Sequence, residues 1–291
     1  MHQFMQAIGF SHMEDRKQTD AILQDVLKHY DDKMVVEDEE GHLIGEISKS
    51  FGTDCGITIC GEYDENNDFH MEYYYPYFRG VNISMQEEVI LERHAGKESY
   101  AGACEDVRVG VTVIFYLQNM GDFLNLKIKK DLPQTKTSVM LSALAKEGTI
   151  LLPVQKTVEQ EQTNRDMSIQ RNRMISAARN GDEEAMESLT MEDIDTYSMI
   201  SRRIATEDVF TIVDTYFMPF GVECDQYNVM GTIESCEQVK NRLTGEELYQ
   251  MELVCNDIRM DVCINKESLM GEPEVGRRFK GIVWLQGYVN F

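Results

Sequence analysis

The segment from Gly231 to Phe291 constrains the fold most, because its turn residues, alternating apolar positions and glycines all indicate the same structure. Residues 229–239 and 246–255 each predict a β-strand, and the polar residues between them predict a turn. Asn256 and Asp257 predict a tight turn into a third strand, whose apolar side chains share one face at period two. These side chains are Ile258, Met260, Val262 and Ile264. Three strands joined by short connections form a meander.

The rest of this segment predicts the closure of a small barrel. Residues 265–269 have the pattern of one helical turn, and glycines follow at 271, 276 and 281. The final run contains the only tryptophan, Trp284, and is interrupted by Gly281 and Gly287, so it can bend across a barrel. The C-terminal part therefore resembles the small β-barrel of the oligonucleotide/oligosaccharide-binding fold. This likeness concerns shape and not activity.

The first half of the chain predicts an α+β domain with a mostly antiparallel sheet and few helices. An amphipathic helix is expected over residues 17–30, and a hairpin over 34–48 turns at Gly41. Ser84 and Glu87 have capping-box spacing and predict a short helix that ends near residue 93. Further strands are expected at 56–61, 69–77, around 82, and at 107–117, 123–128, 137–145 and 149–154.

Residues 157–205 are more polar and predict helices with weak apolar faces. One helix is expected over 159–179, a second begins after Asp182, and a third opens at Thr190. These helices bridge the domains with one side in solvent, or cover part of a neighbouring surface. The expected organisation is an α+β domain at 1–156, a helical connector at 157–205 and a barrel-like domain at 206–291.

The composition limits the classes of protein to which this chain can belong. The chain has 291 residues, of which 42% are apolar, which is enough for two domains with real cores. No apolar run approaches the roughly 18 to 20 residues of a membrane span, and the N-terminal residues lack the pattern of a secretion signal. The sequence therefore predicts a soluble, cytoplasmic protein.

The net charge of −23, from 51 acidic and 28 basic residues, opposes binding to phosphate backbones and to anionic membranes. Seven cysteines, an odd number, are scattered without a CxxC pair, and packed reduced thiols are expected. The six histidines show no HxH, HxxxH or HExxH spacing. Residues 64–68 are rich in oxygen ligands but lack the glycine and final glutamate of a calcium loop. No metal and no cofactor is predicted.

A tyrosine-rich strand at 69–79 is the first candidate binding site. On an extended strand, Met71, Tyr73, Tyr75 and Tyr77 would lie on one face, close to Arg79. Tyrosine rings offer apolar area and a polar tip, so this row could line a ligand cleft or bind a protein. Tyrosine also favours strands for structural reasons alone.

A basic cluster near the C-terminus is the second candidate. Arg277, Arg278 and Lys280 precede Trp284, a mixture that could contact phosphates and stack on bases in a single-strand-binding barrel. Glu272 and Glu274 are equally available to pair with the arginines. The acidic charge of the whole chain makes nucleic-acid binding unlikely.

Catalytic motifs are weak. Residues 96–99, Gly-Lys-Glu-Ser, lack the upstream glycine of a phosphate-binding loop and place a glutamate between lysine and serine. A GxSxG nucleophile elbow is absent from the sequence. The pattern leaves enzymatic activity open but favours a non-enzymatic role.

Four stretches carry a family resemblance, namely 225–228, 263–266, 271–281 and 284–288. With them the chain resembles a full-length uncharacterised family of anaerobic, gut-type Firmicutes bacteria that bears a domain-of-unknown-function label. The resemblance implies a bacterial cytoplasmic protein without an assigned reaction, so it transfers no catalytic residue.

Three functional hypotheses remain open from the sequence. The leading one is a protein-binding or regulatory module that presents Tyr73 and Tyr75 to an unidentified protein partner. The second is a small-ligand binder or enzyme with a cleft between the domains, using Glu72, Arg79 or Arg108. The third is a single-strand nucleic-acid binder that uses the basic cluster. The sequence leaves the oligomeric state open.

Overall fold

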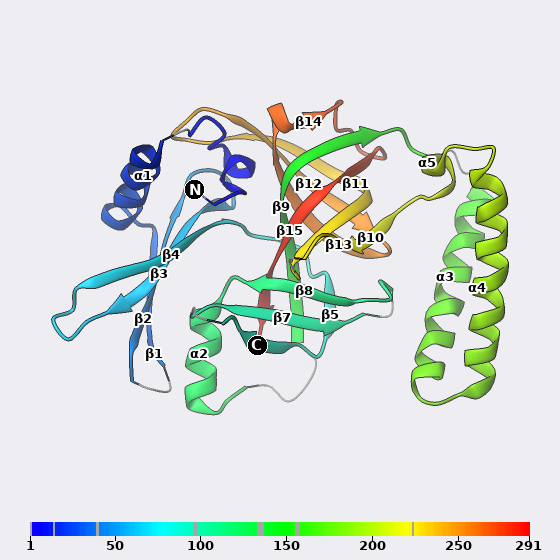
Figure 1. The fold of residues 1–291 in the computed structure, drawn as a ribbon, viewed down its shortest axis with the longest axis horizontal. Helices are drawn as coiled ribbons and strands as arrows, with labels where there is room; N and C mark the ends of the chain where they lie inside the picture. The colour runs from blue at the N-terminus through cyan, green and yellow to red at the C-terminus, as the bar shows by residue number, and fades with distance from the viewer. Residues whose placement is uncertain are drawn as a thin grey trace.

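The computed structural model describes residues 2–13, 15–38, 41–95, 98–106, 108–132, 137–154, 158–222 and 224–291. It is an α+β structure, as predicted, with a four-stranded antiparallel sheet and a larger mixed sheet (Figure 1). Among the described residues, no helix is both long and apolar enough to span a membrane.

The smaller sheet confirms the strands expected in the first part of the chain. Its order follows the sequence: β1 (Asp32–Glu37), β2 (Leu43–Ser50), β3 (Cys55–Tyr63) and β4 (Phe69–Phe78). Each neighbouring pair is antiparallel. Gly41, in the turn before β2, has a φ of 90°, the left-handed conformation expected there.

One helix and one helical turn pack near this sheet. The helix α1 (Arg16–Lys28) begins at Asp15, whose side chain accepts a hydrogen bond from the Lys17 amide. Its buried residues Leu23 and Val26 belong to the same apolar cluster as the turn η1 (Met5–Ile8) and the sheet residues Ile47, Ile57 and Ile59. These groups bury the face of the sheet that lies away from α2 (Figure 1).

The larger sheet contains most of the second half of the chain. Its strand order is β10 (Tyr216–Pro219), β11 (Gln226–Lys240), β12 (Glu247–Cys255), β13 (Ile258–Asn265), β9 (Thr137–Leu151), β15 (Arg278–Asn290), β8 (Thr112–Leu117), β7 (Tyr100–Glu105) and β6 (Ile90–Arg93). Two short strands, β5 (Met85–Glu87) and β14 (Leu269–Met270), also pair with β9.

The C-terminal strands form no ring without a strand from the first half of the chain. β9, from the first half of the chain, lies between β13 and β15, parallel to the former and antiparallel to the latter. Pairing therefore runs from β11 through β12, β13, β9 and β15 back to β11. The sheet continues beyond β15 into β8, β7 and β6, and the predicted barrel fold is not confirmed. β9 precedes the predicted boundary at residue 156 and pairs with strands of the predicted 206–291 domain.

The local predictions in the C-terminal segment are confirmed. The turn at Asn256 and Asp257 has φ values of 49° and 61°, typical of a tight hairpin. The four residues expected on one face of β13, from Ile258 to Ile264 in steps of two, are at most 1% exposed. The expected helical turn is present as η2 (Lys266–Ser268).

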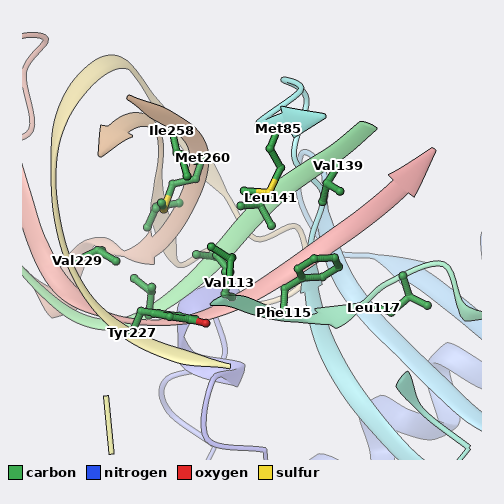
Figure 2. Packing of buried hydrophobic residues seen from close by; sticks show 14 of the residues in the cluster. Met85, Val113, Phe115, Leu117, Val139, Leu141, Tyr227, Val229, Ile258 and Met260 are labelled. Carbon is green, nitrogen blue, oxygen red and sulfur yellow. The ribbon is translucent and has the colours of Figure 1, made fainter. Parts of the chain in front are cut away.

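The core between the strands is closely packed (Figure 2). Val113, Phe115 and Leu117 of β8 point into it, as the alternation predicted, although the strand begins at Thr112 and residues 108–111 form turns. A Cβ atom at either Gly102 or Gly287 would lie 2.3 Å from the Phe115 ring. These two glycines therefore leave the space that the ring occupies.

Two local predictions are wrong for a common reason. Residues 123–128 form part of a helix, α2 (Met120–Lys129), because Met120, Phe123 and Leu124 bury one helical face. Ser84 does not cap a helix, because its hydroxyl accepts a hydrogen bond from the Leu141 amide at 2.9 Å. In both places contacts with strands distant in the sequence decide the local structure.

The connector forms a helical hairpin of α3 (Val158–Arg179) and α4 (Glu183–Ile204), followed by the short α5 (Val209–Ile212). The third helix predicted at Thr190 does not begin there, because its hydroxyl bonds to the Met186 carbonyl inside α4. Likewise, the two strands predicted at 137–145 and 149–154 are the single strand β9. The hairpin stands beside the body of the molecule (Figure 1).

Candidate functional site

A polar pocket of about 180 Å³ lies between the four-stranded sheet, the start of α2 and the end of β15. The sheet contributes Asp32, Met34, Glu46, Ser48, Thr58, Tyr75 and Tyr77, and Arg79 follows at the end of β4. The opposite wall is formed by Gln118, Asn119, Asp122 and Tyr288. Polar side chains that converge on a cavity are typical of ligand sites.

The register of the smaller sheet explains why its pocket residues share a face. Met34 lies opposite Glu46, and Ser48 lies opposite Thr58, which in turn lies opposite Tyr75. Directly opposed residues in antiparallel strands point to the same side of the sheet. The face that meets α2 is therefore polar, whereas the face that meets α1 is apolar.

Glu46 is the most perturbed acid of the pocket. Its Oε2 atom accepts a hydrogen bond of 2.9 Å from the amide of Gly121, in the first turn of α2. Protein atoms surround its carboxyl group, and this desolvation raises the pKa of Glu46 to about 7. The nearby carboxylates of Asp122 and Asp32 raise it further, while the Gly121 hydrogen bond and the Arg79 charge oppose the rise. Glu46 can therefore gain or lose a proton near neutral pH.

The two buried tyrosines of the pocket are neutral. Tyr75 is 3% exposed and Tyr77 is 7% exposed. Desolvation raises the pKa of both, to about 12 for Tyr77. The Tyr75 hydroxyl donates a long hydrogen bond of 3.4 Å to the Gln118 carbonyl. These hydroxyls can act as hydrogen-bonding groups but not as bases at physiological pH.

Arg79 supplies the positive charge of the pocket. Its backbone amide donates to the Asp54 carbonyl at 2.8 Å, and its guanidinium carbon lies 5.3 Å from the centre of the Tyr77 ring. Arg79 is exposed, and within the part of the chain that the structure describes no ion pair involves it. A stacked, unpaired guanidinium is well suited to bind a carboxylate or phosphate.

The opposite wall is held by hydrogen bonds between α2 and β15. Asp122 Oδ2 accepts bonds of 3.1 Å from the Tyr288 hydroxyl and from Asn119 Nδ2. Asn119 also bonds to both backbone groups of Val289, at 2.9 and 3.1 Å. This wall is therefore fixed independently of any ligand.

Gln118 joins this wall to β4. Its Nε2 atom donates to the Phe78 carbonyl at 2.7 Å and to Gln286 Oε1 at 2.8 Å. Its Oε1 atom is buried and, among the described residues, has no hydrogen-bond partner. A buried acceptor without a partner costs about 1 to 3 kcal/mol, which is uncommon outside functional sites.

The residues of the predicted tyrosine row lie in different environments. Tyr73, Tyr75 and Tyr77 share a face as expected, but Tyr73 lies outside the pocket and donates to the Glu98 carbonyl at 2.6 Å. Met71 is on the other face, beside Tyr74 and α1, because the pairing of β3 with β4 shifts between Cys60 and Gly61.

Of the three polar residues considered for a cleft, only Arg79 lines this pocket. Arg108 pairs with Asp106 at 2.5 Å and donates to the carbonyls of Ser84 and Asp257. Glu72 is also absent from the lining.

The predicted basic cluster does not form one exposed face. Arg278 is 4% exposed and donates to the carbonyls of Leu152, Phe210 and Val213. Trp284 is 5% exposed, and its Nε1 atom donates to Asp225 at 2.6 Å. Both side chains are therefore structural in this conformation and unavailable for contact with phosphates or bases.

The other two members of the cluster have separate neighbours. Arg277 pairs with Glu274 at 2.9 Å, one of the acidic residues considered from the sequence. The Lys280 ammonium lies 4.4 Å from the centre of the Phe210 ring. The four residues thus occupy different environments.

Sequence reasoning missed Glu46, Asp122 and Tyr288. Glu46 lies two residues after the buried Ile44 in β2, so a carboxyl group at an inward position was a signal in the pattern. Asp122 was not considered because the adjacent residues were read as a strand. Across the described ranges, no group of three or more His, Cys, Asp or Glu side chains could hold a metal ion.

Comparison with known proteins identifies a family. Residues 5–287 match a family model described as a domain of unknown function from E. rectale (DUF3881). This agrees with the expected uncharacterised family from Firmicutes. No curated protein and no solved structure matches the chain.

Proposed function

The chain belongs to the DUF3881 family, whose description states no activity, and we propose that it binds a small polar molecule in the pocket beside Glu46. The observation that carries this proposal is the convergence of a desolvated carboxyl group and an unpaired guanidinium on one polar cavity. Ionisable groups with perturbed pKa values beside a cavity are more typical of binding and catalytic sites than of a packed interior.

The pocket favours the cleft hypothesis over a protein-binding tyrosine face. Tyr75 and Tyr77 are buried, so a folded partner protein cannot pack on them without opening the structure. They can contact a molecule small enough to enter the cavity. Glu46, with a pKa near 7, can also exchange a proton with such a molecule, which is the property required of a general acid or base.

A binding screen tests this proposal. Thermal unfolding and ¹H-¹⁵N NMR spectra would be recorded with single amino acids, diamines, dicarboxylates and polyols at millimolar concentration. We expect at least one class to raise the unfolding temperature and to shift the amide signals of Glu46, Arg79 and Asp122. Glu46→Gln should weaken binding, while Glu65→Gln, at an exposed hairpin tip, should not. If every class is inactive, or if shifts occur only elsewhere, the proposal is wrong.

The helical hairpin supports a second candidate function, association of two copies of the chain. Among the described side chains of α3 and α4, only Ala185 is buried. Met186, Ile194 and Tyr197 have the spacing of one helical face and are 44%, 56% and 75% exposed. Two hairpins can bury such faces together as a four-helix bundle, which one hairpin cannot do.

Light scattering after size-exclusion chromatography tests this association. We expect a dimer for the natural chain and a monomer for the double variant Ile194→Glu, Tyr197→Glu. Ser188→Glu, exposed elsewhere on α4, serves as the matched control and should stay dimeric. A monomer for the natural chain at micromolar concentration would exclude the hairpin interface.

A further inference from the structure

The charges of the pocket are unequally distributed. Three carboxyl groups, those of Asp32, Glu46 and Asp122, face one guanidinium group, that of Arg79. The acids come from β1, β2 and α2, so they converge from three elements. Asp32 and Asp122 are both near enough to Glu46 to perturb its ionisation. A cavity with this excess of negative charge favours a ligand with a cationic group.

The hydrogen-bonding capacity of the pocket points in the same direction. Ionised carboxylates only accept hydrogen bonds, and the protein satisfies one Glu46 oxygen through Gly121. The Ser48 and Thr58 hydroxyls bond to each other at 2.8 Å. The buried side-chain oxygen Oε1 of Gln118, a residue that lines the pocket, is an acceptor without a partner within the described part of the chain. These acceptors require hydrogen-bond donors from the ligand, and an ammonium group supplies three.

Arg79 meets a different part of the ligand. Glu46 is level with Tyr73 across the sheet, and Arg79 follows six residues later, just after the end of β4. Its guanidinium lies over the Tyr77 ring, and its charge also acts on the Glu46 carboxyl group. A planar guanidinium that stacks on Tyr77 presents paired donors to a carboxylate.

The cavity is small, with a volume of about 180 Å³. We infer that the pocket binds a small zwitterion, with its ammonium group against the acidic wall and a separated carboxylate on Arg79. This inference rests on the proposed function and names its ligand class.

Isothermal titration with five four-carbon probes tests the inference. The probes are γ-aminobutyrate, butylamine, butyrate, 1,4-diaminobutane and succinate. We expect γ-aminobutyrate to bind at least tenfold more tightly than any of the other four. Arg79→Gln should remove its advantage over butylamine, and Glu46→Gln should reduce its advantage over butyrate. Glu65→Gln provides the control that should leave all five affinities unchanged.

The possible failures are distinguishable. If succinate or the diamine binds as tightly as γ-aminobutyrate, the ligand class is wrong while the binding pocket stands. If none of the five probes binds, the inference is overturned, and the broader screen then decides the proposed function. Because Arg79 is exposed, the Arg79→Gln variant should fold. It therefore still tests the inference if the Glu46→Gln variant does not fold.

Discussion

Glu46 connects the pocket to the stability of the whole protein. Its pKa is raised from 4.5 to about 7 on folding. Between these values the unfolded chain has lost the proton while the folded chain keeps it, so the folded state binds more protons. The free energy of unfolding must therefore fall as the pH rises through this window. A difference of this size corresponds to about 3 kcal/mol, since one pKa unit is about 1.4 kcal/mol.

Glu46→Gln should remove this dependence, because glutamine stays neutral at every pH. Urea unfolding from pH 4.5 to pH 8 would measure it. We expect the variant to gain stability relative to the natural chain as the pH rises, by about 3 kcal/mol in total. Glu65→Gln is the control. Parallel pH profiles for the natural chain and Glu46→Gln would contradict the assigned ionisation.

Gly121 allows α2 to approach the sheet. A Cβ atom at this position would lie 2.1 Å from Met34 Sδ and 2.9 Å from Glu46 Oε2. Alanine normally stabilises a helix by about 1 kcal/mol over glycine, but here the flexible ends of Met34 and Glu46 must first move aside. We expect Gly121→Ala to change the free energy of unfolding by less than about 1 kcal/mol. In a Met34→Ala background the overlap is gone, so the same substitution should be more favourable, and additive effects would contradict the contact.

Arg277 and Arg278 form a matched pair of adjacent residues with different surroundings. Arg278→Met would leave the carbonyls of Leu152, Phe210 and Val213 without their donor. We expect a loss of about 3 kcal/mol in chemical unfolding, because buried acceptors would remain unpaired. Arg277→Met removes a largely exposed ion pair and should cost less than about 1 kcal/mol. Equal losses would contradict the buried role of Arg278.

This pair also shows a limit of the sequence at the residue scale. Both arginines lie in one basic run, and their chemistry suggested phosphate contacts. The carbonyls that bind Arg278 come from positions 152, 210 and 213, which no local pattern connects with residue 278. Hydrogen bonds to carbonyl groups that are distant in the sequence therefore decide the role of Arg278.

At the scale of elements, periodicity was informative where one face of a strand was buried and the other was not. The strands of the smaller sheet and the Ile258 face of β13 were predicted for this reason. The helix α2 was wrongly predicted as a strand because a short apolar segment fits both the helical and the strand period. That error concealed part of the pocket, since Asp122 of α2 lines it and the Gly121 amide bonds to Glu46. The tyrosine strand, in contrast, was placed with Tyr75, Tyr77 and Arg79 near one another.

The hairpin of α3 and α4 should be separable from the rest of the structure. Its two helices pack chiefly on each other, and α5 follows before the chain enters β10. Replacing residues 158–204 with a short Gly-Ser linker should leave the body folded and abolish dimerisation. Circular dichroism melting and light scattering would measure both effects. A body that no longer folds, or that still dimerises, would contradict this division of roles.

At the scale of the molecule, the sequence predicted the strands of the C-terminal segment but not their missing neighbour. Turns and alternation specify connections between consecutive strands. The position of β9 between β13 and β15 joins residues more than a hundred positions apart, and its pairing with β13 is parallel. Such long-range pairing produces no periodic pattern in the sequence of either strand. The α+β class was therefore predictable, while the position of β9 between β13 and β15 was not.

A fragment comprising residues 206–291 tests this dependence on β9. Alone, it would lack the strand that pairs with β13 and with almost the whole length of β15, exposing apolar side chains on both. We expect a poorly dispersed ¹H-¹⁵N NMR spectrum and no cooperative unfolding. Co-expression with residues 1–205 should restore both properties, because the second fragment returns β9. A fragment that unfolds cooperatively on its own would show that the C-terminal strands are sufficient, and that β9 adds to a domain already formed.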